Sequence, residues 1–171
     1  MRKHNGMRPQ DVAILLKICA LGQQPWQMAG LASSLRISIS EVSESLNRSQ
    51  LAGLIDFTKK KVNRQNLLDF LSHGLQYVFP VQPGPLVRGI PTGHSHPFMK
   101  EKFASEMNYV WPDVKSNVIG SQIDPLYPKQ VEAVLEDSTY YQLLAIADVL
   151  RVGKAREVKY ALEELHKIIL K

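Results

Sequence analysis

The sequence predicts a mainly α-helical protein with a small β-hairpin, and three observations support this prediction. Apolar residues recur at helical spacing within residues 8–21 and again within residues 155–170. After the glycine at residue 53 come a short apolar run and three consecutive lysines. This segment is only long enough for a tight hairpin. Between residues 79 and 127 proline and glycine recur so often that few long helices fit there.

Length and composition bound the kind of protein. The chain has 171 residues, 44% of them hydrophobic, so it can bury a core as one domain or as one small domain with an appended subdomain. Its single cysteine, Cys19, excludes an internal disulfide and lies in an apolar helical pattern that predicts a buried thiol. There is no charged-then-apolar leader and no apolar run of 18 residues, so we expect a soluble cytoplasmic protein without a membrane partner.

The positive charge is unevenly distributed. The net charge is +5, and residues 1–78 carry ten Lys or Arg against five Asp or Glu, whereas residues 79–171 carry eleven of each. All of the excess therefore lies in the first half. A nucleic-acid surface produces this bias through phosphate neutralisation, although a solvated basic face without a partner has the same composition.

Residues 24–55 predict two short helices joined by a tight turn. Pro25 and Trp26 open the first helix, because proline at the first helical position sacrifices no hydrogen bond. Its apolar face consists of Met28, Leu31, Ala32 and Leu35. After the turn at residues 36–37, Ser38 is placed to cap a second helix, Ile39–Leu51, with Glu41 completing a capping box. Gly53 suits the left-handed conformation that closes a helix. This is the layout of a helix that enters a DNA groove.

The same segment resembles the winged helix-turn-helix family of bacterial transcription regulators, in particular the MarR-like branch. In that branch a segment reading roughly LA-x-x-L-x-I-S-x-S-x-V-S-x-x-L-x-R-x-x-x-x-GLI recurs, and thirteen of its places are filled here. They are Leu31, Ala32, Leu35, Ile37, Ser38, Ser40, Val42, Ser43, Leu46, Arg48, Gly53, Leu54 and Ile55. The resemblance covers about residues 8–74. It implies a homodimer that binds double-stranded DNA, although winged-helix domains that lost DNA binding serve as protein-interaction modules.

The resemblance, together with the helix start and stop signals and the positions of proline and glycine, predicts three segments. Residues 1–78 form the winged helix-turn-helix domain: a first helix from Arg8 to about Leu21 behind the helix pair, a wing at residues 56–62, and a helix capped by Asn63. Residues 79–127 form an irregular Pro-rich connection, with extended chain at 80–97, a helix at 98–107, and apolar runs at 109–111 and 117–120 that pair as strands or pack as coil. Residues 128–171 form helices over 128–136, 138–152 and 155–170, and the apolar stripe of the last one meets either its own domain or a second copy.

The candidate DNA-binding residues lie on the second helix of the pair and on the wing. They are Ser38, Ser40, Ser43, Asn47, Arg48, Lys59, Lys60 and Lys61. Asn forms two hydrogen bonds with adenine, and Arg forms two with guanine. Serine hydroxyls near the start of the helix suit phosphate contacts. The lysines add affinity that does not depend on the DNA sequence. Glu41 and Glu44 oppose phosphate binding unless each pairs with an arginine or accepts from a cytosine amine.

Other chemistry has weaker support in the sequence. His94 and His96 are the only close histidine pair, but no acidic residue or cysteine lies at a ligand spacing and no phosphate loop accompanies them, so we expect no enzyme activity, no catalytic residue, no metal site and no cofactor. The cluster of Arg151, Lys154 and Arg156 is explained by structural ion pairing or by an anionic ligand. The Pro-rich middle is a candidate wall for a pocket that holds a small-molecule effector, although no residue there identifies a ligand. The sequence thus predicts a sequence-specific transcriptional regulator that places a recognition helix in the major groove of DNA.

Overall fold

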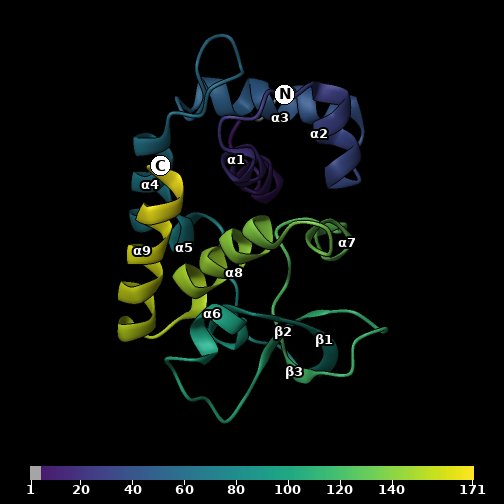
Figure 1. The fold of residues 1–171 in the computed structure, drawn as a ribbon, viewed down its shortest axis with the longest axis vertical. Helices are drawn as coiled ribbons and strands as arrows, with labels where there is room; N and C mark the ends of the chain where they lie inside the picture. Colours follow the sequence, from purple (N-terminus) through teal and green to yellow (C-terminus); the bar gives the residue numbers. More distant parts are fainter. Residues whose placement is uncertain (1–4) are drawn as a thin grey trace.

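The computed structural model describes residues 5–171 as a mainly helical protein with one small sheet (Figure 1). The helices of the N-terminal half are α1 (Pro9–Leu21), α2 (Met28–Leu35), α3 (Ile39–Leu51), α4 (Arg64–His73) and the short α5 (Leu75–Val78). Those of the C-terminal half are α7 (Gln130–Val134), α8 (Ser138–Val152) and α9 (Ala155–Ile169). Between them lie the strands β1 (Leu86–Thr92), β2 (Tyr109–Pro112) and β3 (Ile119–Gln122), the 3-10 turn η1 (Gly93–Ser95) and the short α6 (Pro97–Lys100).

α3 has the boundaries that its local signals predict, but the prediction that Pro25 and Trp26 open the helix before it is wrong, because the chain stays extended through Gln27 and α2 begins at Met28. Arg36 ends α2 in the left-handed conformation, with φ 59°, and its backbone N–H closes the last turn. The Ser38 hydroxyl accepts from the Glu41 backbone N–H at 3.1 Å, and the Glu41 carboxylate accepts from the Ser38 backbone N–H at 3.1 Å. Both halves of the predicted capping box are therefore present. Gly53 follows α3 at φ 75°, the conformation for which a glycine was expected.

The hairpin after α3 is shorter than a two-stranded wing. Ile55 and Val62 form a single antiparallel bridge, and the Asp56 backbone N–H donates to the Lys61 carbonyl at 2.8 Å. Asn63 occupies the N-cap position of α4, but its side chain makes no cap and donates to the Gly53 carbonyl at 2.8 Å. The prediction of an Asn63 side-chain cap is wrong, because that amide closes the base of the hairpin instead.

The middle segment contains the sheet, which corrects the prediction of an irregular connection. β1 lies within the part expected to be only extended chain and turns, and it pairs antiparallel with β2 through Gly89–Thr92 and with β3 through Leu86–Arg88. β2 and β3 also pair with each other in parallel, so each strand contacts the other two. The predicted helix at 98–107 is wrong beyond its first turn, since α6 ends at Lys100.

Gly89 permits the close approach of β1 and β2. A Cβ atom at this position would lie 2.0 Å from the Trp111 carbonyl oxygen, which no side chain tolerates. The Trp111 ring itself is fully buried, and its indole N–H donates to Asp148 of α8 at 2.7 Å. The sheet is thereby attached to the helical part of the molecule through a buried hydrogen bond.

The C-terminal helices share one hydrophobic core with α1, α3 and α4. In Figure 1, α8 lies between α1 and the sheet, and α9 stands beside α4. Lys17 of α1 donates to Asp137 at the start of α8 at 2.7 Å. The buried apolar positions of α9 are Ala161, Leu165 and Ile169, so its apolar stripe packs within the chain. The predicted segments 1–78 and 128–171 therefore do not have separate cores. Residues 1–4 of the first segment lie outside the described residues.

Candidate nucleic-acid interface

One side of α3 is exposed along its whole length. Ser40, Glu44, Asn47 and Leu51 recur at three- and four-residue steps on this side, and all four are exposed, while Ser43 at its edge is half-buried. The opposite side is buried against α1 and α2 and consists of Val42, Ser45, Leu46 and Ser49. Apart from Leu51, the side chains on the exposed side carry hydroxyl, amide or carboxylate groups, so this side presents hydrogen-bonding groups at helical spacing.

The hairpin beside α3 has a tip that hydrogen bonds hold in one shape. One Asp56 carboxylate oxygen accepts from the backbone N–H groups of Lys60 and Lys61, each at 3.0 Å, and the other accepts from the Thr58 hydroxyl at 2.7 Å. The bond from the Lys61 backbone, followed by that from Thr58, lowers the pKa of Asp56 below its usual value. Lys59 is in the left-handed conformation with φ 58°. The tip is therefore ordered although it is exposed.

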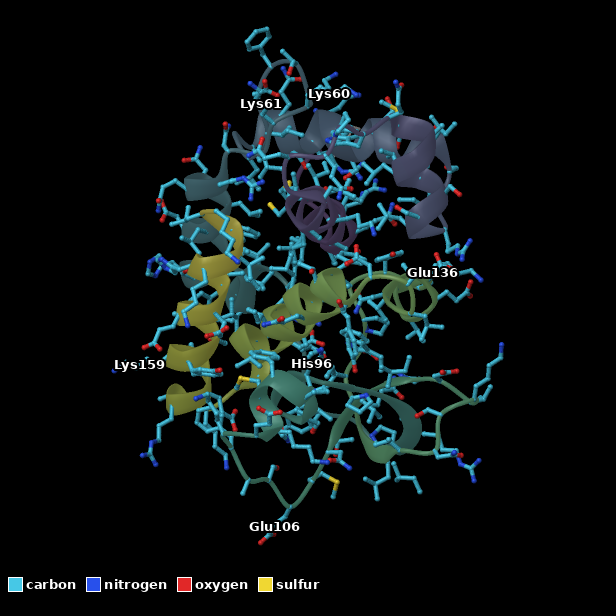
Figure 2. The ribbon with its side chains drawn as sticks, viewed as in Figure 1. Lys60, Lys61, His96, Glu106, Glu136 and Lys159 are labelled. Carbon is cyan, nitrogen blue, oxygen red and sulfur yellow. The ribbon has the colours of Figure 1, made fainter. Side chains whose placement is uncertain are left out.

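The three lysines of the hairpin have different surroundings. The Lys59 ammonium donates to the Asn47 side-chain oxygen and so links the hairpin to α3. The Lys60 ammonium lies 4.2 Å from the centroid of the Trp26 ring and donates to the Trp26 carbonyl at 3.2 Å. Lys61 is exposed. Figure 2 labels Lys60 and Lys61 on this hairpin, at the opposite end of the molecule from Glu106. Sequence reasoning did not predict Trp26 as a partner of the lysines, because the two are far apart in the chain.

Arg48 does not lie on the exposed side of α3. Its guanidinium binds both carboxylate oxygens of Asp11 in α1, at 2.8 and 2.7 Å, and its side chain is 11% exposed. Asp11 is fully buried. Hydrogen bonding to Asp11 raises the pKa of Arg48 above its already high value. The structure gives Arg48 a positioning role that orients α3 on α1, in place of the predicted contact with a base.

Ser38 and the two glutamates are also explained by local contacts. The Ser38 hydroxyl donates to the Glu41 carboxylate at 3.1 Å, so its proton is already used within the capping box. The Glu41 charge lies in the first turn of α3, where the helix dipole stabilises it. The Glu44 carboxylate lies 3.9 Å from the Arg48 guanidinium, which compensates part of its charge. The predicted arginine partner for one of the glutamates is thus present in the structure.

The C-terminal half leaves this surface uncovered. In Figure 1, α3 and the hairpin form one end of the molecule, and the sheet lies at the other end beyond α8. Arg36, at the end of α2, forms an exposed ion pair with Glu136 of the C-terminal half at 3.3 Å. We define the helix–hairpin surface as Ser40, Ser43, Asn47, Lys59, Lys60 and Lys61.

The remaining candidate groups form structural contacts. The Pro-rich segment lines an open cleft of about 560 Å³ that Arg151 also borders. The Arg151 guanidinium, however, is bound to Asp148 at 2.6 Å and to the Asp124 carbonyl at 3.0 Å, so the cleft presents no free arginine to an anion. The Lys154 backbone N–H donates to Glu157 at 2.9 Å and completes the start of α9. The structural interpretation of this charged cluster is thus confirmed for Arg151, which is ion-paired with Asp148.

The histidine pair lies at the turn between β1 and α6, and both side chains are buried. His94 forms a hydrogen bond with the Met107 carbonyl at 2.7 Å, and His96 Nδ1 accepts from the Phe98 backbone N–H at 3.3 Å as the N-cap of α6. Within residues 5–171 no group of three or more His, Cys, Asp or Glu side chains is arranged to hold a metal ion.

We expect His96 to make the protein less stable in mild acid. Burial lowers the pKa of His96 from 6.5 to about 4, so the unfolded chain binds a proton below pH 6.5 that the folded chain binds only near pH 4. The free energy of unfolding should therefore fall by up to about 3 kcal/mol as the pH decreases through this interval. Urea denaturation at neutral pH and at about pH 4.5 measures this. His96→Asn should remove that part of the pH dependence while its carbonyl keeps an N-cap acceptor. His73→Asn makes the same substitution at an exposed position of α4 and serves as the matched control. Equal pH dependence in all three proteins would contradict the prediction.

The described residues thus define a mainly helical protein with a small three-stranded sheet and an exposed helix–hairpin surface. No family model, no curated protein and no solved structure matches the chain. None of the helices within residues 5–171 has both the length and the apolar composition needed to cross a bilayer.

Proposed function

We propose that this protein is a winged-helix transcriptional regulator that binds double-stranded DNA through the helix–hairpin surface. The observation that carries the proposal is the link between Asn47 and Lys59, which joins the exposed side of α3 to the cationic hairpin as one uncovered surface. A helix of this size fits the major groove, and a hairpin next to it reaches the flanking backbone. Phosphate attraction accounts for the excess of positive charge in the first half of the chain.

Each residue of the surface has a distinct part in this proposal. The Asn47 amide nitrogen donates to an adenine edge while its oxygen is held by Lys59. Ser40 and Ser43 donate to phosphate oxygens. The lysines contribute affinity that depends on salt and not on sequence. Arg48 acts through its bond to Asp11, which sets the direction of α3.

The proposal includes a homodimer, since a twofold pair matches a palindromic operator and places its two reading helices about 34 Å apart. The apolar stripe of α9 packs within the chain, so the dimer uses another surface. Electron microscopy or crystallography of the DNA complex measures this separation directly.

A protein-interaction module is the second candidate, and the exposed side of α3 specifically favours it. Ile39 is 52% exposed and Leu51 is 71% exposed, which supplies apolar area next to the polar groups. The helix itself carries no cation on that side, because Arg48 is bound to Asp11. Absence of DNA binding at low salt would favour this candidate.

The lysines of the hairpin supply the first test. Affinity for a mixed-sequence duplex should fall steeply as salt rises. Changing Lys59, Lys60 and Lys61 together to glutamine should lower affinity and reduce the slope of log K against log salt by about two to three, since each lost phosphate contact removes about 0.9. Fluorescence anisotropy at several salt concentrations measures both quantities.

A charge-matched control separates contact from net charge. Lys115, Lys159 and Lys171 are exposed and lie in the other half of the chain, and changing them to glutamine removes the same charge. This control should leave the slope nearly unchanged. No measurable binding of the wild-type protein at low salt, or equal slopes for the two triple variants, would contradict the proposal that this surface binds DNA.

A further inference from the structure

Phe57 at the tip of the hairpin is 84% exposed. It belongs neither to the buried core nor to the partly buried residues packed against that core. An isolated exposed apolar side chain needs no explanation by itself. The surroundings of Phe57 differ from those of an ordinary surface residue in two respects, its rigid support and its charged neighbours.

The hairpin holds Phe57 at a fixed position. Asp56, immediately before it, accepts from the Lys60 and Lys61 backbones and from the Thr58 hydroxyl. The Lys59 backbone N–H donates to the Asp56 carbonyl at 3.0 Å, and Lys59 adopts the left-handed conformation that a side-chain-bearing residue rarely accepts. The bonds of Asp56 keep its own carboxylate within the turn, and Phe57 is left as the large side chain of the tip. Little backbone conformational entropy is then lost when this tip contacts a partner.

The charges around the ring favour a nucleic acid as that partner. Lys59, Lys60 and Lys61 follow Phe57 within four residues, so a phosphate backbone is attracted to the same tip that presents the ring. Phe is among the apolar side chains that proteins insert between base steps from the minor groove, which unstacks the step and bends the duplex.

The position of the hairpin agrees with minor-groove insertion. The hairpin projects beyond α3 at the end of the molecule, and the Lys59–Asn47 bond fixes it next to the helix (Figure 1). With α3 in a major groove, the tip therefore lies over the adjoining minor groove. We propose that Phe57 is a wedge that inserts into the minor groove and bends the DNA, with a preference for flexible pyrimidine–purine steps. This inference rests on the proposed function. It adds to that function the role of Phe57, the contact with the minor groove and the bending of the DNA.

The test compares Phe57 variants on one duplex. The wild-type protein selects its preferred sequence from a random pool of duplexes about 30 bp long, and this duplex then carries a donor and an acceptor dye at its ends. Wild-type protein should raise energy transfer because the duplex bends. Phe57→Ala should abolish the rise and weaken binding by about tenfold, with an unchanged salt slope, because stacking and not charge is lost. Phe57→Leu should keep most of the bend, because leucine also serves as a wedge.

Val114→Ala is the matched control, since Val114 is 88% exposed but lies in the loop between β2 and β3. It should leave both bending and affinity unchanged, and far-UV circular dichroism should show all variants folded. If the wild-type protein binds and Phe57→Ala bends the duplex equally well, the wedge is refuted and the proposed function stands. If the wild-type protein binds no duplex at low salt, the proposed function fails and the wedge fails with it. Loss of binding to anionic vesicles in Phe57→Ala, with DNA binding intact, would overturn the wedge in favour of a lipid contact.

Discussion

Replacing Arg48 by alanine should lower the free energy of unfolding by about 3–5 kcal/mol, because it leaves a buried carboxylate without its cation. Asp11 is fully buried, and both of its oxygens are bound by Arg48. The Arg8 backbone N–H at 2.8 Å is the other donor to this carboxylate, and it carries no net charge. Since small domains are stable by only about 5–15 kcal/mol, much of the stability depends on this pair. Urea denaturation followed by circular dichroism measures the loss.

Two further variants determine whether the buried charge is the cause. Arg36→Ala removes an arginine whose ion pair with Glu136 is exposed, and it should cost no more than about 1 kcal/mol. The double change Asp11→Asn with Arg48→Gln removes both charges and should be less destabilising than Arg48→Ala alone. A loss in Arg48→Ala as small as that in Arg36→Ala would contradict the positioning role. Loss of DNA binding in Arg48→Ala is therefore evidence for base contact only if the variant is shown to be folded.

Replacing Asp148 by alanine should cost about 4 kcal/mol of unfolding free energy, since it leaves several donors unsatisfied at once. The carboxylate accepts from the Thr92 hydroxyl at 2.6 Å, from the Trp111 indole at 2.7 Å and from the Arg151 guanidinium at 2.6 Å. Asp148 is 1% exposed and the Arg151 side chain is 4% exposed, so water does not replace these bonds. This one side chain joins α8 to two elements of the sheet region. Thermal and urea unfolding measure the loss.

Asp148→Asn should be less destabilising than Asp148→Ala, because the amide oxygen keeps an acceptor for the indole or the hydroxyl. Asp69→Ala changes an exposed aspartate that accepts only from Gln65 of the same helix, and it should cost less than about 0.5 kcal/mol. Fluorescence of the buried Trp111 should report loosening of the sheet in Asp148→Ala. If Asp148→Ala and Asp69→Ala were equally stable, the buried network would not have the importance that its geometry indicates.

Elements whose signals lie close together in the chain were predictable from the sequence. The capping box of Ser38 and Glu41 and the glycine at 53 set both ends of α3, and each signal needs only a few neighbouring residues. The same is true of the start of α1 at Pro9 and of the break at Gly153 between α8 and α9. The buried free thiol of Cys19 also followed from helical spacing.

The sheet was not predictable because its pairing joins distant residues. β1 is interrupted by Pro91 and Gly89, which locally favour turns and coil. Its strand conformation is stabilised by pairing with β2 and β3, which lie roughly twenty or more residues further along the chain. The short runs at 109–111 and 117–120 are candidate strands in the sequence, but their register and the close approach of Gly89 to Trp111 arise only when the strands pair. Local propensity therefore fails where tertiary contacts outweigh it.

The candidate site shows the same division. The sequence by itself determined that α3 has one polar side, where α3 begins and ends, and that a lysine hairpin follows it. Only the tertiary structure decided that Arg48 turns inward to an aspartate 37 residues away, that Lys59 bonds Asn47, and that Phe57 is left at an ordered tip. The physical reason is that capping and periodicity act over one or two helical turns, whereas the direction of a long charged side chain is set by the nearest buried charge of opposite sign.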